Sequence, residues 1–167
     1  MGGAHRHDVD FYGWTQEQAS LLRAGPSDAR LLDLDNLAEE VEDMGRSEIR
    51  EVASLLRQTL LHLIKIAITP DAVDANHWFD EVVAFQGDAV LAFSPGLRQR
   101  VDLQAIWKLA RNGAIQSLER SGVSVPLLPE SCPLTLDELL DAEFDVTHAV
   151  KVISDNIQAN PSSTHRK

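Results

Sequence analysis

The chain has 167 residues and a formal net charge of −11 at pH 7, and 44% of its residues are hydrophobic. This length fits one domain with a well-formed core. The acidic balance argues against binding to nucleic acid, which needs a basic surface. No apolar run approaches the ~20 residues that span a bilayer, so we expect no membrane segment.

The N-terminus lacks the apolar core of a secretory signal, and the single cysteine, Cys132, excludes an internal disulfide framework. Together these features predict a cytoplasmic protein. We expect residues 1–9 to be flexible and residues 10–155 to form a single helical-bundle domain. Residues 156–167 are predicted to be a polar C-terminal tail.

The first expected helix is short and covers residues 16–24. Thr15 and Gln18 have the spacing of a capping box, and Gly25-Pro26 supplies a stop signal.

The dominant feature of the sequence is a long periodic segment over residues 33–68. Gly45 interrupts it, but the apolar phase is the same on both sides, so the pattern predicts one long helix in which Gly45 is the natural position for a bend. The period of about 3.6 residues is carried by Leu34, Leu37, Val41, Met44, Ile49, Val52, Leu56, Leu60, Leu63 and Ile66.

A third helix is expected over residues 73–93, with an apolar face of Trp78, Val82, Phe85, Ala89 and Ala92 that Val83 and Val90 broaden. Ser94-Pro95 then has the form of an N-cap followed by proline, which predicts a fourth helix running to Ser121 before Gly122. Its predicted inner face consists of Leu103, Ile106, Trp107, Ala110, Ala114 and Leu118.

Beyond a proline-containing connection, Thr135 and Glu138 form a second capping-box pattern, which predicts a short helix there. Residues 146–153 are expected to add a final helical segment. The predicted fold is therefore all-α: a helical bundle built on one long central helix, with a short N-terminal helix and a C-terminal helical clip. A central helix of this length outruns its companions and would leave apolar residues uncovered, so we expect a homodimer.

Four ordered motifs resemble a bacterial family known as domain of unknown function number twenty-nine. They are DFYGWTQEQASLLR at 10–23, LDLDNLAEEVEDMGRSEIRE at 32–51, LLHLIK at 60–65 and PESCPLTLDELLD at 129–141. The resemblance implies an all-helical bundle and supplies no catalytic residues.

The first half of the long helix is strongly acidic, with eight carboxylates over residues 33–51 against Arg46 and Arg50. Residues 97–120 are instead basic, and the two surfaces would complement each other within the fold or across a dimer. The acidic face predicts either salt bridges with neighbouring arginines, a Mg²⁺ or Ca²⁺ site, or docking of a partner. The residues assigned to partner docking are Glu39, Glu40, Glu42 and Asp43.

A second candidate site combines His77 and Glu81 on one face of the third helix with His62 on the long helix. These three ligands and a water would make an open zinc site. The plainer interpretation is that His62 pairs with a carbonyl or carboxylate and that His77 is a surface residue. Cys132 lies in a loop without a histidine close in sequence, so it is not expected to be a nucleophile.

Two functions are consistent with these patterns. The preferred one is a protein-interaction module that binds a basic partner through the acidic helix face, without a cofactor. The alternative is a metal-dependent enzyme of the small helical-bundle type, using His62, His77 and Glu81.

Overall fold

The structure, a computed structural model, describes residues 11–24 and 31–157. Within these ranges the chain is helical and has no strand, which confirms the predicted all-α class. The chain divides into two compact units, Met1–Ser47 and Glu48–Lys167. The tails predicted over 1–9 and 156–167 lie almost wholly outside the described residues.

The first unit contains helix α2 (Phe11–Ala24), which begins five residues earlier than predicted. Thr15 therefore lies inside the helix and is not its N-cap, so the first predicted capping box is wrong. Gln18 has a different role: its side chain is 2% exposed and its Oε1 accepts a hydrogen bond from the backbone N–H of Asp33 at 2.9 Å. This bond ties α2 to the start of the next helix.

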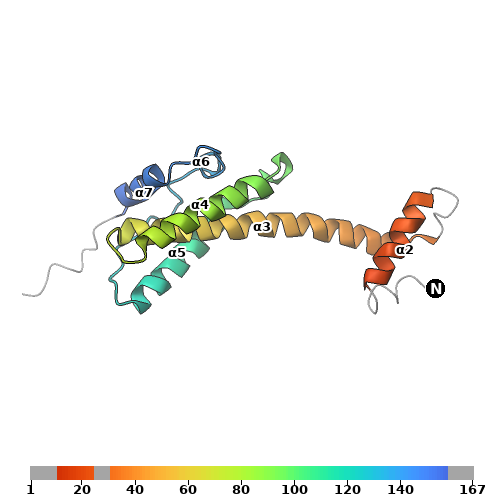
Figure 1. Cartoon of the computed structure of the whole chain (residues 1–167), viewed down its shortest axis with the longest axis horizontal. Helices are drawn as coiled ribbons and strands as arrows, with labels where there is room; N and C mark the ends of the chain where they lie inside the picture. Colours follow the sequence, from red (N-terminus) through yellow and green to blue (C-terminus); the bar gives the residue numbers. More distant parts are fainter. Residues whose placement is uncertain (1–10, 25–30, 158–167) are drawn as a thin grey trace, which may run out of the picture. The chain divides into compact units, whose positions relative to one another are not determined.

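Helix α3 (Leu34–Ile68) has 35 residues and passes through Gly45 without interruption (Figure 1). This confirms the long helix predicted over 33–68. It is nearly twice as long as α4 (Ala75–Ala92) or α5 (Leu103–Arg120), which have 18 residues each. Companions of that length can cover only part of the apolar face of α3.

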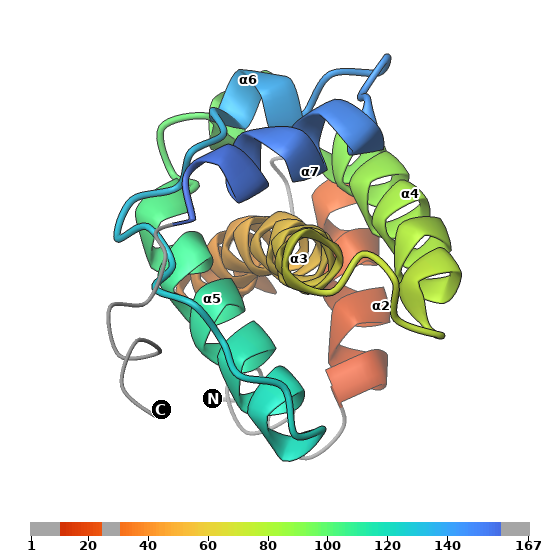
Figure 2. The same ribbon diagram turned by 90° about the vertical axis from the view of Figure 1, so that its left-hand side faces the viewer.

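The second unit is built around the later part of α3. Figure 2 looks along α3 and shows α4, α5 and α7 (Val146–Asp155) placed around it. Trp107 of α5 is fully buried, and its indole Nε1 donates a hydrogen bond to the carbonyl of Pro129 at 3.1 Å. The other large side chains that are fully buried come from α3, α4, α7 and the C-terminal clip: Val52, Leu56, Thr59, Leu60, Leu63, Ile64, Val82, Leu139 and Ile153.

The predicted fourth helix is split in two. Pro95–Leu97 forms a short 3-10 helix, η2, and α5 begins only at Leu103. Ser94 makes no side-chain cap bond, whereas Asp102 caps α5 by accepting a hydrogen bond from the backbone N–H of Ala105 at 3.0 Å. The stronger cap therefore determines where the helix starts. The predicted end is confirmed, since α5 stops at Arg120 and Gly122 has φ +79°.

The C-terminal clip forms as predicted. Helix α6 (Leu136–Leu139) begins with the capping box of Thr135 and Glu138. The buried side chain of Gln86, on α4, donates to the carbonyls of Leu139 and Asp141 at 3.1 and 2.8 Å. The two hydrogen bonds of Gln86 therefore connect the clip to α4.

The predicted apolar face of the third helix is correct for most of its members but wrong for Val83. That side chain is 52% exposed, whereas Val82 and Ala89 are fully buried.

Replacing Leu60 by Ala should lower the free energy of unfolding by about 2–5 kcal/mol, because Leu60 is fully buried and the change leaves a cavity. Urea denaturation followed by circular dichroism measures this loss. Leu109→Ala is the matched control, since Leu109 is 59% exposed and should change stability by less than about 0.5 kcal/mol. Equal effects of the two substitutions would contradict the described core.

Candidate functional site

The three residues predicted as metal ligands come together between α3 and α4. The imidazole Nε2 of His62 lies 2.8 Å from Oε2 of Glu81, and Nε2 of His77 lies 3.5 Å from Oε1 of the same carboxylate. His77 and Glu81 are one helical turn apart on α4, which places them on one face. His62 reaches them from the buried face of α3, where it is 9% exposed.

The surroundings of His62 determine its protonation state. Its Nδ1 is buried and has no hydrogen-bond partner, so the proton of the neutral ring belongs on Nε2, which donates to Glu81. The ring stacks on Phe85, with 6.1 Å between centroids and 14° between planes. Burial lowers the pKa of His62, and this outweighs the opposing attraction of Glu81. A charged ring would bury an N–H on Nδ1 without an acceptor.

Lys65 lies one turn beyond the cluster on α3, and its Nζ is 4.0 Å from the ring centroid of Trp78 on α4. This cation–π contact joins the same two helices as the His62–Glu81 pair. Partial burial lowers the pKa of Lys65, against the opposing attraction of Asp74 and Glu81.

In the part of the chain that the structure describes, no group of three or more His, Cys, Asp and Glu side chains is placed to hold a metal ion. In the cluster of His62, His77 and Glu81, each histidine contacts a different oxygen of the one carboxylate. Both histidines thus share one carboxylate, and the His62–Glu81 hydrogen bond joins α3 to α4. A metal site at these residues stays a prediction.

The acidic face lies on the part of α3 that belongs to the first unit. Glu39, Glu42 and Asp43 are exposed, and Glu40 is half-buried. Arg46 forms ion pairs with Glu42, at 3.3 Å, and with Asp43. Such exposed pairs contribute little to stability and exchange readily with other partners.

Apolar residues are exposed on this same part of α3. Leu34, Val41 and Met44 are 64%, 66% and 69% exposed. This confirms the expectation that the long helix leaves part of its apolar face uncovered. Within the second unit, Arg98 pairs with Asp137. The expected match between the basic and acidic surfaces stays a prediction.

Cys132 is not a reactive thiol. Burial raises its pKa to about 11, so the group is protonated at neutral pH.

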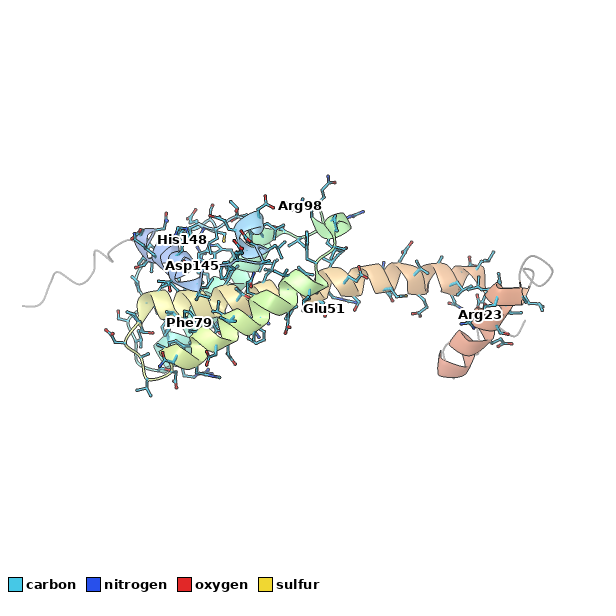
Figure 3. The ribbon with its side chains drawn as sticks, turned by 45° about the horizontal axis from the view of Figure 1, so that its top comes forward. Arg23, Glu51, Phe79, Arg98, Asp145 and His148 are labelled. Atoms are coloured by element: carbon cyan, nitrogen blue, oxygen red, sulfur yellow. The ribbon has the colours of Figure 1, made fainter. Side chains whose placement is uncertain are left out.

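A shallow pocket of about 200 Å³ lies between α6 and α7, and its lining includes Glu138, Asp145 and His148. Figure 3 shows Asp145 and His148 together at the start of α7. Both carboxylates already have structural roles, because Glu138 completes its capping box and Asp145 accepts a hydrogen bond from the backbone N–H of His148 at 3.0 Å. Hydrogen bonds from Thr135 lower the pKa of Glu138.

Sequence reasoning missed the roles of Gln86, Phe85 and Lys65. Gln86 offered a signal, since it is a polar residue next to the apolar positions of α4. The stacking of Phe85 and the position of Lys65 over Trp78 depend on how α3 and α4 pack, and no local pattern indicates them.

Among the described residues, none of the helices combines the length and hydrophobicity required to cross a membrane.

Two comparisons with known proteins agree with this fold. Residues 7–145 match the family described as Domain of unknown function DUF29. An α-helical protein of unknown function from Rhodospirillum rubrum is 37% identical, with a TM-score of 0.69, over 87% of this chain and 95% of that chain. No curated protein matches the chain. The comparisons support the family resemblance and supply no activity.

His62 should make stability depend on pH. Above about pH 6.5 the ring is neutral in both the folded and the unfolded chain. As the pH falls below that value, the unfolded chain takes up a proton before the folded chain does, so the free energy of unfolding decreases until the lower folded-state pKa is reached. His62→Gln keeps a donor for Glu81 but does not titrate. It should reduce the slope of stability against pH by up to about 1.4 kcal/mol per pH unit.

Urea denaturation at a series of pH values measures this slope. The wild type, measured in parallel over the same pH range, gives the reference slope. An unchanged slope in His62→Gln would show that His62 titrates normally in the folded protein.

Proposed function

This chain belongs to the family described as Domain of unknown function DUF29, and on that premise we propose that it is a protein-interaction module. In this proposal a basic partner protein binds the first half of α3, over residues 34–47. The observation that carries the proposal is that this helix half exposes carboxylates and apolar side chains together, whereas residues 52–66 of the same helix form the core.

The charge of this segment supports a basic partner. Residues 34–47 contain five carboxylates and one arginine, and every residue from 41 to 48 is exposed. A field of one sign accelerates association with an oppositely charged surface, and salt screens it. The ion pairs of Arg46 are exposed, so they cost little to exchange for a lysine or arginine of the partner.

Removing three of these charges should weaken binding. The variant Glu39→Gln, Glu42→Gln and Asp43→Asn keeps the shape of each side chain and should recover at least about fivefold less of any basic partner from a native lysate, since several close charge pairs are lost. Quantitative mass spectrometry of the captured proteins measures this recovery, and higher salt should reduce capture by the wild type.

The matched control removes three exposed carboxylates of the second unit for which the structure gives no ion pair or hydrogen bond: Asp80→Asn, Asp88→Asn and Glu119→Gln. It has the same net charge as the test variant and should capture the partner as the wild type does. Equal losses in both variants would mean that net charge, and not this face of α3, governs capture.

The alternative, a metal-dependent enzyme, is favoured by one observation, the meeting of His62, His77 and Glu81. Elemental analysis of protein purified without a histidine tag tests it. The interaction proposal expects no stoichiometric metal. Zinc, nickel or iron at one ion per chain that is lost in His77→Ala would overturn this expectation and favour the enzyme.

A further inference from the structure

Large apolar side chains that are exposed are concentrated in the first unit. The 25 residues of that unit whose exposure the structure describes, 17–24 and 31–47, hold five of these side chains. The 110 described residues of the second unit, 48–157, hold six. Contiguous exposed apolar surface of this kind marks a place that another chain covers.

The exposed apolar side chains of α3 form a narrow stripe. We define the α3 stripe as Leu34, Leu37, Val41 and Met44, which lie within about 80° of one another around the helix. Spacing of three, four and three residues is that of the a and d positions in a two-helix seam, which is narrower than the face a helix buries in a globular core. By contrast, the buried residues within 52–66 surround more than about half of the same helix. A single helix therefore fits the stripe.

The stripe is almost free of charge. Four of the five carboxylates within residues 34–47 lie about 120–180° around the helix from the middle of the stripe: Asp35, Glu39, Glu42 and Asp43. Residues beside an a/d seam set partner choice through their charges. Here these flanking residues are Ala38, Glu40, Gly45 and Ser47. A charged foreign helix would thus find one charged flanking residue to recognise.

From these observations we propose that a second copy of this chain covers the α3 stripe, with each copy placing its stripe on that of the other. Homodimer interfaces are apolar, poor in charge and resemble a core cut in half, whereas interfaces with transient foreign partners are about as polar as the rest of the surface. The stripe has the homodimer character. Leu34 and Val52 are five helical turns apart, so the stripe continues the face of α3 that forms the core.

The backbone beside the stripe allows a second helix to approach closely. A Cβ built on Gly45 would have no neighbour within 4 Å, and Ala38 lies two turns before it on the same side of the helix. Small residues beside large ones let two identical patches fit together about a two-fold axis.

The first half of α3 also needs a cover that accompanies the chain. Among residues 34–47, all of which the structure describes, no side chain is buried. Helices in proteins are stabilised chiefly by packing of their apolar face, and Gly45 costs about 1 kcal/mol relative to alanine. A second copy is present whenever the chain is made, so it meets this need without any other protein.

This inference goes beyond the proposed function, because it concerns the other side of the same helix half. Glu39, Glu42 and Asp43 lie away from the stripe and stay exposed when two stripes pair. Each copy in the dimer therefore keeps the surface that we propose for the basic partner.

Sedimentation velocity of the full-length protein over about 1–100 µM tests the inference. The wild type should form a dimer in this range. Val41→Glu with Met44→Glu should raise the dissociation constant at least about a hundredfold, because the seam would then bury carboxylates of both copies without partners. The matched control, Leu91→Glu with Leu109→Glu, adds the same charge at residues of the second unit that are 86% and 59% exposed, and should dimerise as the wild type does.

Amide hydrogen exchange of the wild type gives a second measurement that needs no variant. Amides within residues 34–47 should exchange at least about fivefold more slowly at the highest concentration than at the lowest, because the second copy covers them. Amides within residues 52–66 should exchange at the same rate at both concentrations, since the core of each copy already protects them.

Three results would overturn the inference. A wild type that stays monomeric up to about 100 µM removes the dimer, and the charge variants of α3 would still test the basic partner separately. A dimer that withstands Val41→Glu with Met44→Glu, with exchange of residues 34–47 independent of concentration, places the interface on another surface. A monomer that captures a foreign protein, with capture lost in the same variant, assigns the stripe to that protein.

Discussion

The structure depends on the burial of one face of α3 by α4, α5 and α7. Val52, Leu56, Leu60 and Leu63 are all fully buried on that helix. Removal of apolar surface from water, at about 25 cal/mol per Å², is the main force available to hold such a bundle together. The neutral state of His62 follows from the same burial, because the packing that buries the ring leaves Nδ1 without a partner.

The sequence predicted the helical bundle correctly, but it placed the first residue of two helices wrongly. The repeat of α3 continues through Gly45, so the long helix was predictable to within a residue. The capping box of Thr135 and Glu138 was also correct. Thr15 and Ser94 matched similar patterns and failed, because several nearby positions can start a helix and long-range contacts select among them. Gln18 illustrates this, since its partner is the backbone of Asp33.

For the candidate sites too, the sequence predicted some features and missed others. Helical spacing placed His77 and Glu81 on one face of α4, and it placed the carboxylates of α3 on the outside. It could not show that Nε2 of His62 meets Glu81, because that contact depends on how two helices pack side by side. Nor could it show that Cys132 is buried enough to raise its pKa to about 11. Both features depend on how separate helices and loops pack against one another, and no local sequence pattern indicates that packing.

The account rests on α3 being one helix with a core half and an exposed half. Amide hydrogen exchange of the wild-type protein along residues 34–68 tests this most directly. The account predicts the strongest protection over residues 52–66, and over residues 41–49 a weaker protection that still exceeds that of an unstructured chain by at least about tenfold. Exchange of the amides around Gly45 at the unstructured rate would contradict it.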